Sequence, residues 1–275
     1  MNPERKNENT HQNQPDSPKD PQGQKGSTKE IQSQKRSAKG SRNEILTVRQ
    51  IMIIAVPCLL LYCGLGMPEF GHWVLNILGG EGVILFVGQY IWHFSMAFLF
   101  LFLIPSLLIT KKLNIHLSSI GTQKGDWELG KKLLVLSLLA IPILYFGSDD
   151  PALINEYPLT KVILNSWSLF FLYELLYGVL YYLSYEFFFR GLMQLGLNRH
   201  WSKWRAIIFV SVITTLIHWF PMHKPVSEII AAFMVGIVFG HFAEKTQSWY
   251  YIFAIHYLIG ILNDIYCGLR FLGKL

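Results

Sequence analysis

The chain has 275 residues, of which 51% are hydrophobic, 15% aromatic and only 15% charged. Its mean hydropathy is +0.31, and such values exclude an ordinary soluble domain and indicate a polytopic membrane protein. The net charge of +6 is shared evenly, because residues 1–45 carry nine Lys/Arg against six Asp/Glu and the remainder fifteen against twelve. Neither part has the basic excess of a nucleic-acid-binding protein.

The first 45 residues predict a disordered polar tail. They are rich in Gln, Lys, Ser, Asn, Gly and Pro, and they contain too little apolar surface to offset the conformational entropy lost on folding. A short imperfect duplication of residues 22–29 at 32–39 is low-complexity sequence. The first apolar run begins only near Ile51, so the pattern of a cleaved signal peptide is not seen.

The rest of the chain, residues 46–275, predicts an all-α transmembrane helical bundle. It consists of apolar stretches long enough to cross a bilayer, which takes about 20 helical residues. About seven spans are expected, near residues 50–67, 83–109, 132–147, 162–197, 205–220, 227–243 and 249–267.

The charged connections predict an orientation. Lysines crowd the connection over residues 111–132, and Arg199, Lys203 and Arg205 occupy another, whereas acidic residues gather over 149–156. Because cytoplasmic loops carry an excess of Lys and Arg, this pattern places the N-terminus and the basic connections in the cytoplasm.

One predicted span contains two opposite charges. Glu186 and Arg190 lie four residues apart and therefore on one face of a helix, with Phe187, Phe188 and Phe189 on its other sides. The pair could be a structural ion pair. A functional site is favoured, because charges at membrane depth are costly.

Further ionisable residues lie at a similar depth on other spans. Glu186 and His218 are each thirteen residues from a basic connection, or ~20 Å at ~1.5 Å per residue. Asp264 comes to ~22 Å by the same rise, and His256 and Arg190 lie a turn or two nearer the cytoplasm. The sequence therefore predicts a polar cluster inside the bundle.

These residue types favour hydrolytic chemistry. A desolvated carboxylate suits a general base that takes a proton from water. Two imidazoles with a carboxylate could hold a zinc-like ion, or the imidazoles could stabilise an oxyanion without a metal. The sequence has no His-Glu-x-x-His, Gly-x-Ser-x-Gly or phosphate-loop motif. It therefore gives no support for a zincin, a serine hydrolase or a nucleotide-binding enzyme.

The order of these motifs resembles the CPBP intramembrane proteases, which include CAAX prenyl endopeptidases and bacteriocin-processing or self-immunity proteins. The similarity covers residues 120–267 and is carried by the following elements: Glu186-Phe187-Phe188-Phe189-Arg190-Gly191, His218, Lys224-Pro225-x-x-Glu228, and His256 eight residues before Asp264. It implies an intramembrane endopeptidase in which Glu186 activates water and Arg190 orients that carboxylate. His218 and His256 would bind metal or stabilise the oxyanion, with Asp264 in the same site.

Two positions depart from the family pattern. Many members carry two adjacent glutamates where this chain has Tyr185-Glu186. Gly260 stands where members often have Asn, which leaves Asn263 or Asp264 to replace it. His218 is preferred over His223 as the second histidine because of its depth. These departures leave a catalytically inactive immunity or partner-binding relative as the alternative, and a transporter ranks lowest because no repeated halves are seen.

The resemblance also predicts the surroundings of the protein. The expected partners are membrane lipid and a peptide, or a prenylated or leader-bearing protein, but no nucleic acid. The expected location is a bacterial plasma membrane. A divalent, zinc-like metal held by Glu186, His218 and His256 is the cofactor hypothesis.

Overall fold

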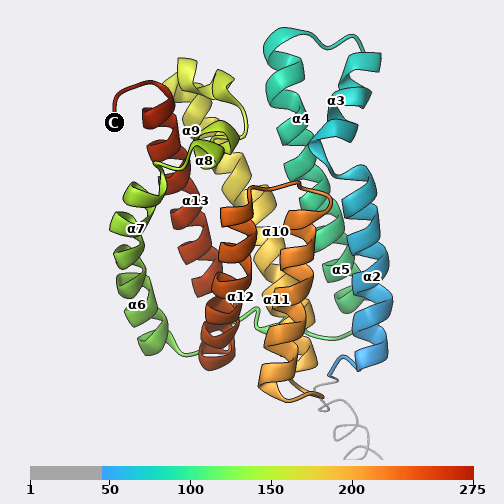
Figure 1. Cartoon of the computed structure of the whole chain (residues 1–275). Helices are drawn as coiled ribbons and strands as arrows, with labels where there is room; N and C mark the ends of the chain where they lie inside the picture. Colours follow the sequence, from blue (N-terminus) through green and yellow to red (C-terminus); the bar gives the residue numbers. More distant parts are fainter. Residues whose placement is uncertain (1–44) are drawn as a thin grey trace, which may run out of the picture. The chain divides into compact units, whose positions relative to one another are not determined.

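A computed structural model describes residues 45–275, and the predicted tail over residues 1–45 lies almost wholly outside them. The described residues form helices and connections without a strand, as the all-α prediction requires (Figure 1). The first part comprises α2 (Val48–Leu65), α3 (Pro68–Ile77), α4 (Gly82–Ala97), η1 (Phe98–Leu103), α5 (Ile104–Leu107), η2 (Leu108–Lys112) and η3 (Leu117–Ile120).

The middle part contains the short helices α6 (Trp127–Leu136), η4 (Ser137–Leu139), α7 (Ala140–Gly147), α8 (Pro151–Glu156) and η5 (Lys161–Asn165). A continuous helical run follows through α9 (Trp167–Leu176), η6 (Tyr177–Tyr182), α10 (Leu183–Glu186) and η7 (Phe187–Leu195). The last three helices are α11 (Lys203–Trp219), α12 (Val226–Thr246) and α13 (Tyr250–Phe271).

Among residues 45–275, five helical stretches are long and apolar enough to cross a membrane. They are Val48–Leu65, Gly82–Lys112, Trp127–Gly147, Val226–Thr246 and Tyr250–Phe271. The other two predicted spans are also helical, as the run over 167–195 and as α11, which has 17 residues. The membrane-protein prediction is confirmed, but the count of seven spans is not.

Local sequence explains where several helices begin. Thr47 forms a capping box with Gln50 at the start of α2, and the Asp126 carboxylate accepts a hydrogen bond from the backbone N–H of Leu129 in α6. The backbone N–H groups of a first helical turn have no partner in their own helix, so such side chains fix the starting residue.

The run over 167–195 is the centre of the bundle. Every residue from Ser184 to Leu197 is buried, and the run packs against α4, η1, α2, α11, α12 and α13 (Figure 1). The outer helices instead expose large apolar side chains, such as Ile143 and Phe146 on α7. This distribution suits a bundle in lipid, where the polar groups are kept inside.

Small residues bring the site-bearing helices close together. A side chain at Gly236 would meet Ser211 of α11 at 3.0 Å, and one at Gly240 would meet Gln194 at 2.8 Å and Ile207 at 2.9 Å. Because glycine leaves room for backbone contact, α12 lies directly against α11 and η7.

Candidate active site

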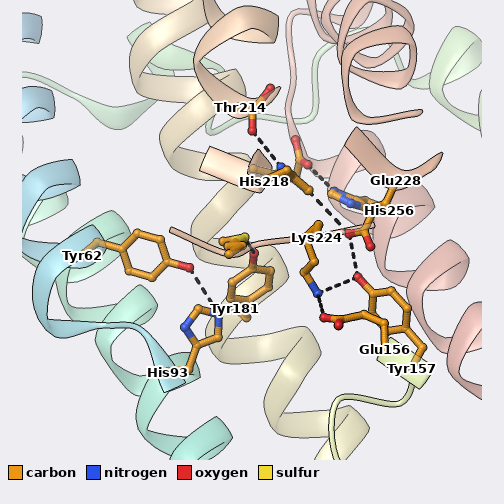
Figure 2. Close-up of polar contacts among 12 residues, drawn as sticks. Tyr62, His93, Glu156, Tyr157, Tyr181, Thr214, His218, Lys224, Glu228 and His256 are labelled. Atoms are coloured by element: carbon orange, nitrogen blue, oxygen red, sulfur yellow. Dashed lines mark hydrogen bonds and ion pairs between the residues drawn. The ribbon is translucent and has the colours of Figure 1, made fainter. Parts of the chain in front are cut away.

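A polar cavity of about 310 Å³ lies between the helices that carry the predicted site. Its lining includes His218 from α11, Glu228 from α12 and His256 from α13, together with Tyr185 from the central run. Figure 2 shows His218, Glu228 and His256 close together, with Tyr157 and Lys224 beside them. Three helices therefore deliver ionisable side chains to one cavity.

Glu186 contacts His256 directly. The Nδ1 atom of His256 lies 2.6 Å from Oε1 of Glu186. Because an ionised carboxylate only accepts hydrogen bonds, Nδ1 carries the proton and donates it, which leaves Nε2 of the neutral ring as an acceptor. The His256 side chain is 26% exposed whereas that of Glu186 is 0% exposed. Glu186 thus lies behind the imidazole and reaches the cavity only through it.

Arg190 lies on the other side of the Glu186 carboxylate. Its Nε atom is 3.6 Å from Oε2 of Glu186, an ion pair with a longer separation than a hydrogen bond. Arg190 also donates to Oε1 of Gln194 at 3.4 Å, and Gln194 donates to the carbonyl of Gly240 at 2.7 Å. The predicted Glu186–Arg190 pairing is present, and the bond from Gln194 to Gly240 links the central run to α12.

His218 has a defined ring orientation. Its Nδ1 donates to the backbone carbonyl of Thr214 at 2.7 Å (Figure 2). Its Nε2 then faces Oε1 of Glu228 across 3.9 Å. In the neutral ring Nε2 is an acceptor, so both atoms of this facing pair accept hydrogen bonds.

Glu228 is anchored by a short polar network. The hydroxyl of Tyr157 donates to Oε1 of Glu228 at 2.7 Å. Lys224 donates to the same hydroxyl oxygen at 2.9 Å and to Glu156 at 2.6 Å. Burial and the neighbouring Glu228 carboxylate raise the pKa of Tyr157 well above its usual value, so its hydroxyl keeps its proton and remains a donor.

Tyr185 occupies the cavity-facing position next to Glu186. Its ring lies edge-on to those of His218 and His256, with centroids 6.4 Å and 5.7 Å away. Successive helical residues point ~100° apart, so Tyr185 lines the cavity while Glu186 points behind His256. Where a protein resembling this one has two adjacent glutamates, the first occupies the position of Tyr185 and would therefore face both imidazoles.

Asp264 lies apart from the other four predicted site residues. It lines a separate cavity of about 120 Å³ with residues such as Ile163 and Trp167. Its carboxyl group is buried and interacts with that of Glu174. The structure thus brings Glu186, Arg190, His218 and His256 together and leaves Asp264 outside this group.

A second, mainly apolar cavity meets the first at its ionisable residues. It has a volume of about 230 Å³, and His218, Glu228 and His256 line both cavities. Its other walls come from α7, α12 and α13, with side chains such as Leu144, Val235 and Ile259. Polar and apolar space therefore join at the two imidazoles.

The predicted metal ligands do not form a three-ligand set. Within residues 45–275, no three His, Cys, Asp or Glu side chains are placed to hold one ion. One Glu186 oxygen contacts His256, the other faces Arg190, and its side chain is fully buried. Glu186, His218 and His256 in this arrangement do not fit a common metal ion.

Glu228 and Tyr157 are part of the site, although no site role for them was predicted from the sequence. The signal for Glu228 is its position ten residues after His218, in the first turn of the next helix. The signal for Tyr157 is its place directly after the acidic segment over residues 149–156, which precedes the central run. His93 also lines the polar cavity, and its Nε2 lies 3.4 Å from the Tyr62 hydroxyl (Figure 2).

Comparison with protein families agrees with the resemblance seen in the motifs. Residues 165–262 match the family described as type II CAAX prenyl endopeptidase Rce1-like. This segment contains Glu186, Arg190, His218 and His256, together with the cavity-lining Glu228. No curated protein and no solved structure matches the chain. The family match falls on the segment that carries the polar core, and it supports the resemblance to the CPBP/CAAX proteases.

Proposed function

We propose that this protein is an intramembrane endopeptidase that hydrolyses a peptide bond in the polar cavity. The observation that carries the proposal is the contact of 2.6 Å between the buried Glu186 and the cavity-lining His256. A buried carboxylate behind an imidazole fixes the ring's tautomer and stabilises its protonated form. The family match supports a protein or peptide substrate and a membrane setting.

The pair can serve hydrolysis in two ways. As a neutral ring, His256 accepts a proton from water at Nε2, and Glu186 stabilises the imidazolium that forms. As an imidazolium, His256 donates from Nε2 to the oxyanion that develops on the carbonyl. In both cases Glu186 acts through the ring, because its own side chain is fully buried. Arg190 holds the rear oxygen of the carboxylate.

The substrate we propose is a peptide that carries a lipid group or an apolar leader. The apolar cavity between α7, α12 and α13 supports this, because it opens directly onto His218 and His256. An apolar substituent placed there would bring the adjoining peptide bond to the polar side. We further propose a bacterial plasma membrane with the N-terminus in the cytoplasm, on the charge pattern of the connections.

No step of this proposal uses a metal ion. The three predicted ligands do not converge, since the Glu186 oxygens face His256 and Arg190. His218 has its proton on Nδ1, so its Nε2 stabilises an oxyanion only when the ring is protonated.

The test is a cleavage assay in reconstituted membranes with prenylated and leader-type peptides. Wild type is expected to cleave at least one of them, and Glu186→Ala is expected to lose the activity because His256 loses its partner. If both proteins leave every peptide intact while wild type still binds a membrane partner, the alternative of an inactive immunity or partner-binding relative holds. Tyr185, in place of a family glutamate, is the observation that favours this alternative.

A further inference from the structure

We propose that Glu228 is the carboxylate that binds the attacking water and takes its proton, with His218 as the second acceptor for that water. This inference rests on the proposed peptidase function and names the base within that site. It replaces the sequence-based hypothesis that Glu186 takes the proton itself.

Glu186 and Glu228 differ in their access to the cavity. The Glu186 side chain is 0% exposed and lies behind His256. The Glu228 side chain is 18% exposed and lines both cavities at the point where they meet. A general base must come within hydrogen-bond reach of the water it deprotonates, and Glu228 meets that requirement.

His218 and Glu228 form a facing pair of hydrogen-bond acceptors. Nε2 of His218 and Oε1 of Glu228 lie 3.9 Å apart, and Nδ1 of His218 is already committed to the Thr214 carbonyl. Two acceptors at this separation leave a gap that one water can bridge by donating a hydrogen to each. A water held in this way has both hydrogens engaged and its lone pairs directed into the cavity.

The two oxygens of Glu228 have different surroundings. Oε1 accepts the Tyr157 hydroxyl at 2.7 Å, and it is also the oxygen that faces His218. Oε2 is buried and has no hydrogen-bond partner within residues 45–275. A carboxylate oxygen has two lone pairs and can accept from Tyr157 and from a water at the same time. Oε1 is therefore the oxygen that takes the proton from the bridging water.

The surroundings hold Glu228 in place. It lies in the first turn of α12, where the positive end of the helix dipole favours a carboxylate. Lys224 does not neutralise it directly, because its ammonium group bonds Glu156 and the Tyr157 oxygen. Tyr157 and Lys224 are thus positioning residues for Glu228.

The proposed step is balanced without any further reactant. The water oxygen forms a bond to the carbonyl carbon, and the proton it releases passes to the Glu228 carboxylate. When the C–N bond of the tetrahedral intermediate breaks, the leaving nitrogen takes that proton, which restores the carboxylate. The Glu186–His256 pair is then left for the oxyanion, with the ring protonated and donating from Nε2.

The test compares Glu228→Gln with Glu128→Gln in the membrane cleavage assay. The Glu228→Gln variant keeps a side-chain oxygen that accepts from Tyr157. Glu128 is likewise a glutamate in the first turn of a helix, but its side chain is 73% exposed on α6. Loss of a general base is expected to lower kcat by about 10²- to 10⁴-fold with little change in KM, whereas Glu128→Gln should cleave at the wild-type rate. Full kcat in Glu228→Gln, or an equal fall in both variants, overturns the inference.

A rescue separates catalysis from a structural role. Position 185 faces both imidazoles, so adding Tyr185→Glu to Glu228→Gln should restore part of the lost kcat. A purely structural role for Glu228 predicts no recovery. If Glu228→Gln does not fold, Glu228→Asp keeps the charge but withdraws the carboxylate by one methylene. It should lower kcat at unchanged KM, and wild-type kcat there overturns the inference.

Failure of the inference differs from failure of the proposed function. An active wild type with an equally active Glu228→Gln refutes only the assignment of the base. A wild type that cleaves none of the peptides refutes the peptidase proposal and this assignment together.

Discussion

Removing the charge of Glu186 should destabilise the bundle strongly, because it leaves Arg190 buried without an opposite charge. Glu186→Gln keeps the shape of the side chain and an oxygen that accepts from His256 Nδ1. It removes only the charge that faces the guanidinium. The Arg190 and Glu186 side chains are 3% and 0% exposed, so solvent cannot replace the lost partner.

The magnitude follows from the geometry. With Nε and Oε2 3.6 Å apart, Coulomb's law gives ~5 kcal/mol of attraction at an effective dielectric constant of ~20. Breaking one side of a buried pair typically costs about 3 to 5 kcal/mol. We therefore expect Glu186→Gln to lower the free energy of unfolding by that amount.

The assay is equilibrium unfolding in mixed micelles for four proteins: wild type, Glu186→Gln, Arg190→Met and the double variant. The double variant has no unpaired buried charge, so its free energy of unfolding should lie nearer to wild type than that of Glu186→Gln. Additive losses in the double variant would refute the reasoning. The reasoning would also be refuted if the free energy of unfolding of Glu186→Gln lay within ~0.5 kcal/mol of wild type, because ordinary surface substitutions cause changes of that size.

Three further outcomes are expected. Gly260→Asn, which restores the residue common in the family, should lower the free energy of unfolding by about 1 to 3 kcal/mol, because a Cβ at Gly260 would collide with the Tyr182 hydroxyl and its Cζ. Thermal unfolding measures this loss, and a variant as stable as wild type would contradict it. Asp264→Asn should leave the cleavage rate unchanged and raise the free energy of unfolding by ~1 kcal/mol, because the new amide can donate to the buried Glu174 carboxylate. A large fall in the cleavage rate would show that Asp264 belongs to the active site. Dialysis against a chelator should leave the cleavage activity intact, because the predicted metal ligands do not converge on one point. Loss of a stoichiometric metal ion together with activity would contradict this expectation.

The sequence could predict the helical class and the existence of an internal polar cluster. Long apolar stretches have one stable arrangement in lipid, in which helices satisfy their own backbone hydrogen bonds. The four-residue spacing of Glu186 and Arg190 predicted their contact, because i and i+4 share a helical face. Counted from a basic connection, His218 had the same depth as Glu186, and His256 was expected a turn or two nearer the cytoplasm. These depths predicted a polar cluster but no particular contact.

The sequence by itself determined which residues are polar inside the bundle, but only the tertiary structure decided which of them meet the cavity. Glu186 and Tyr185 are neighbours in the chain, and the rotation of the central run turns the tyrosine toward the cavity and the carboxylate behind His256. Glu228 lies 71 residues from Tyr157, and no local periodicity reports such a contact. Asp264 had the predicted depth but faces Glu174, because depth along a helix does not fix the direction of a side chain around it.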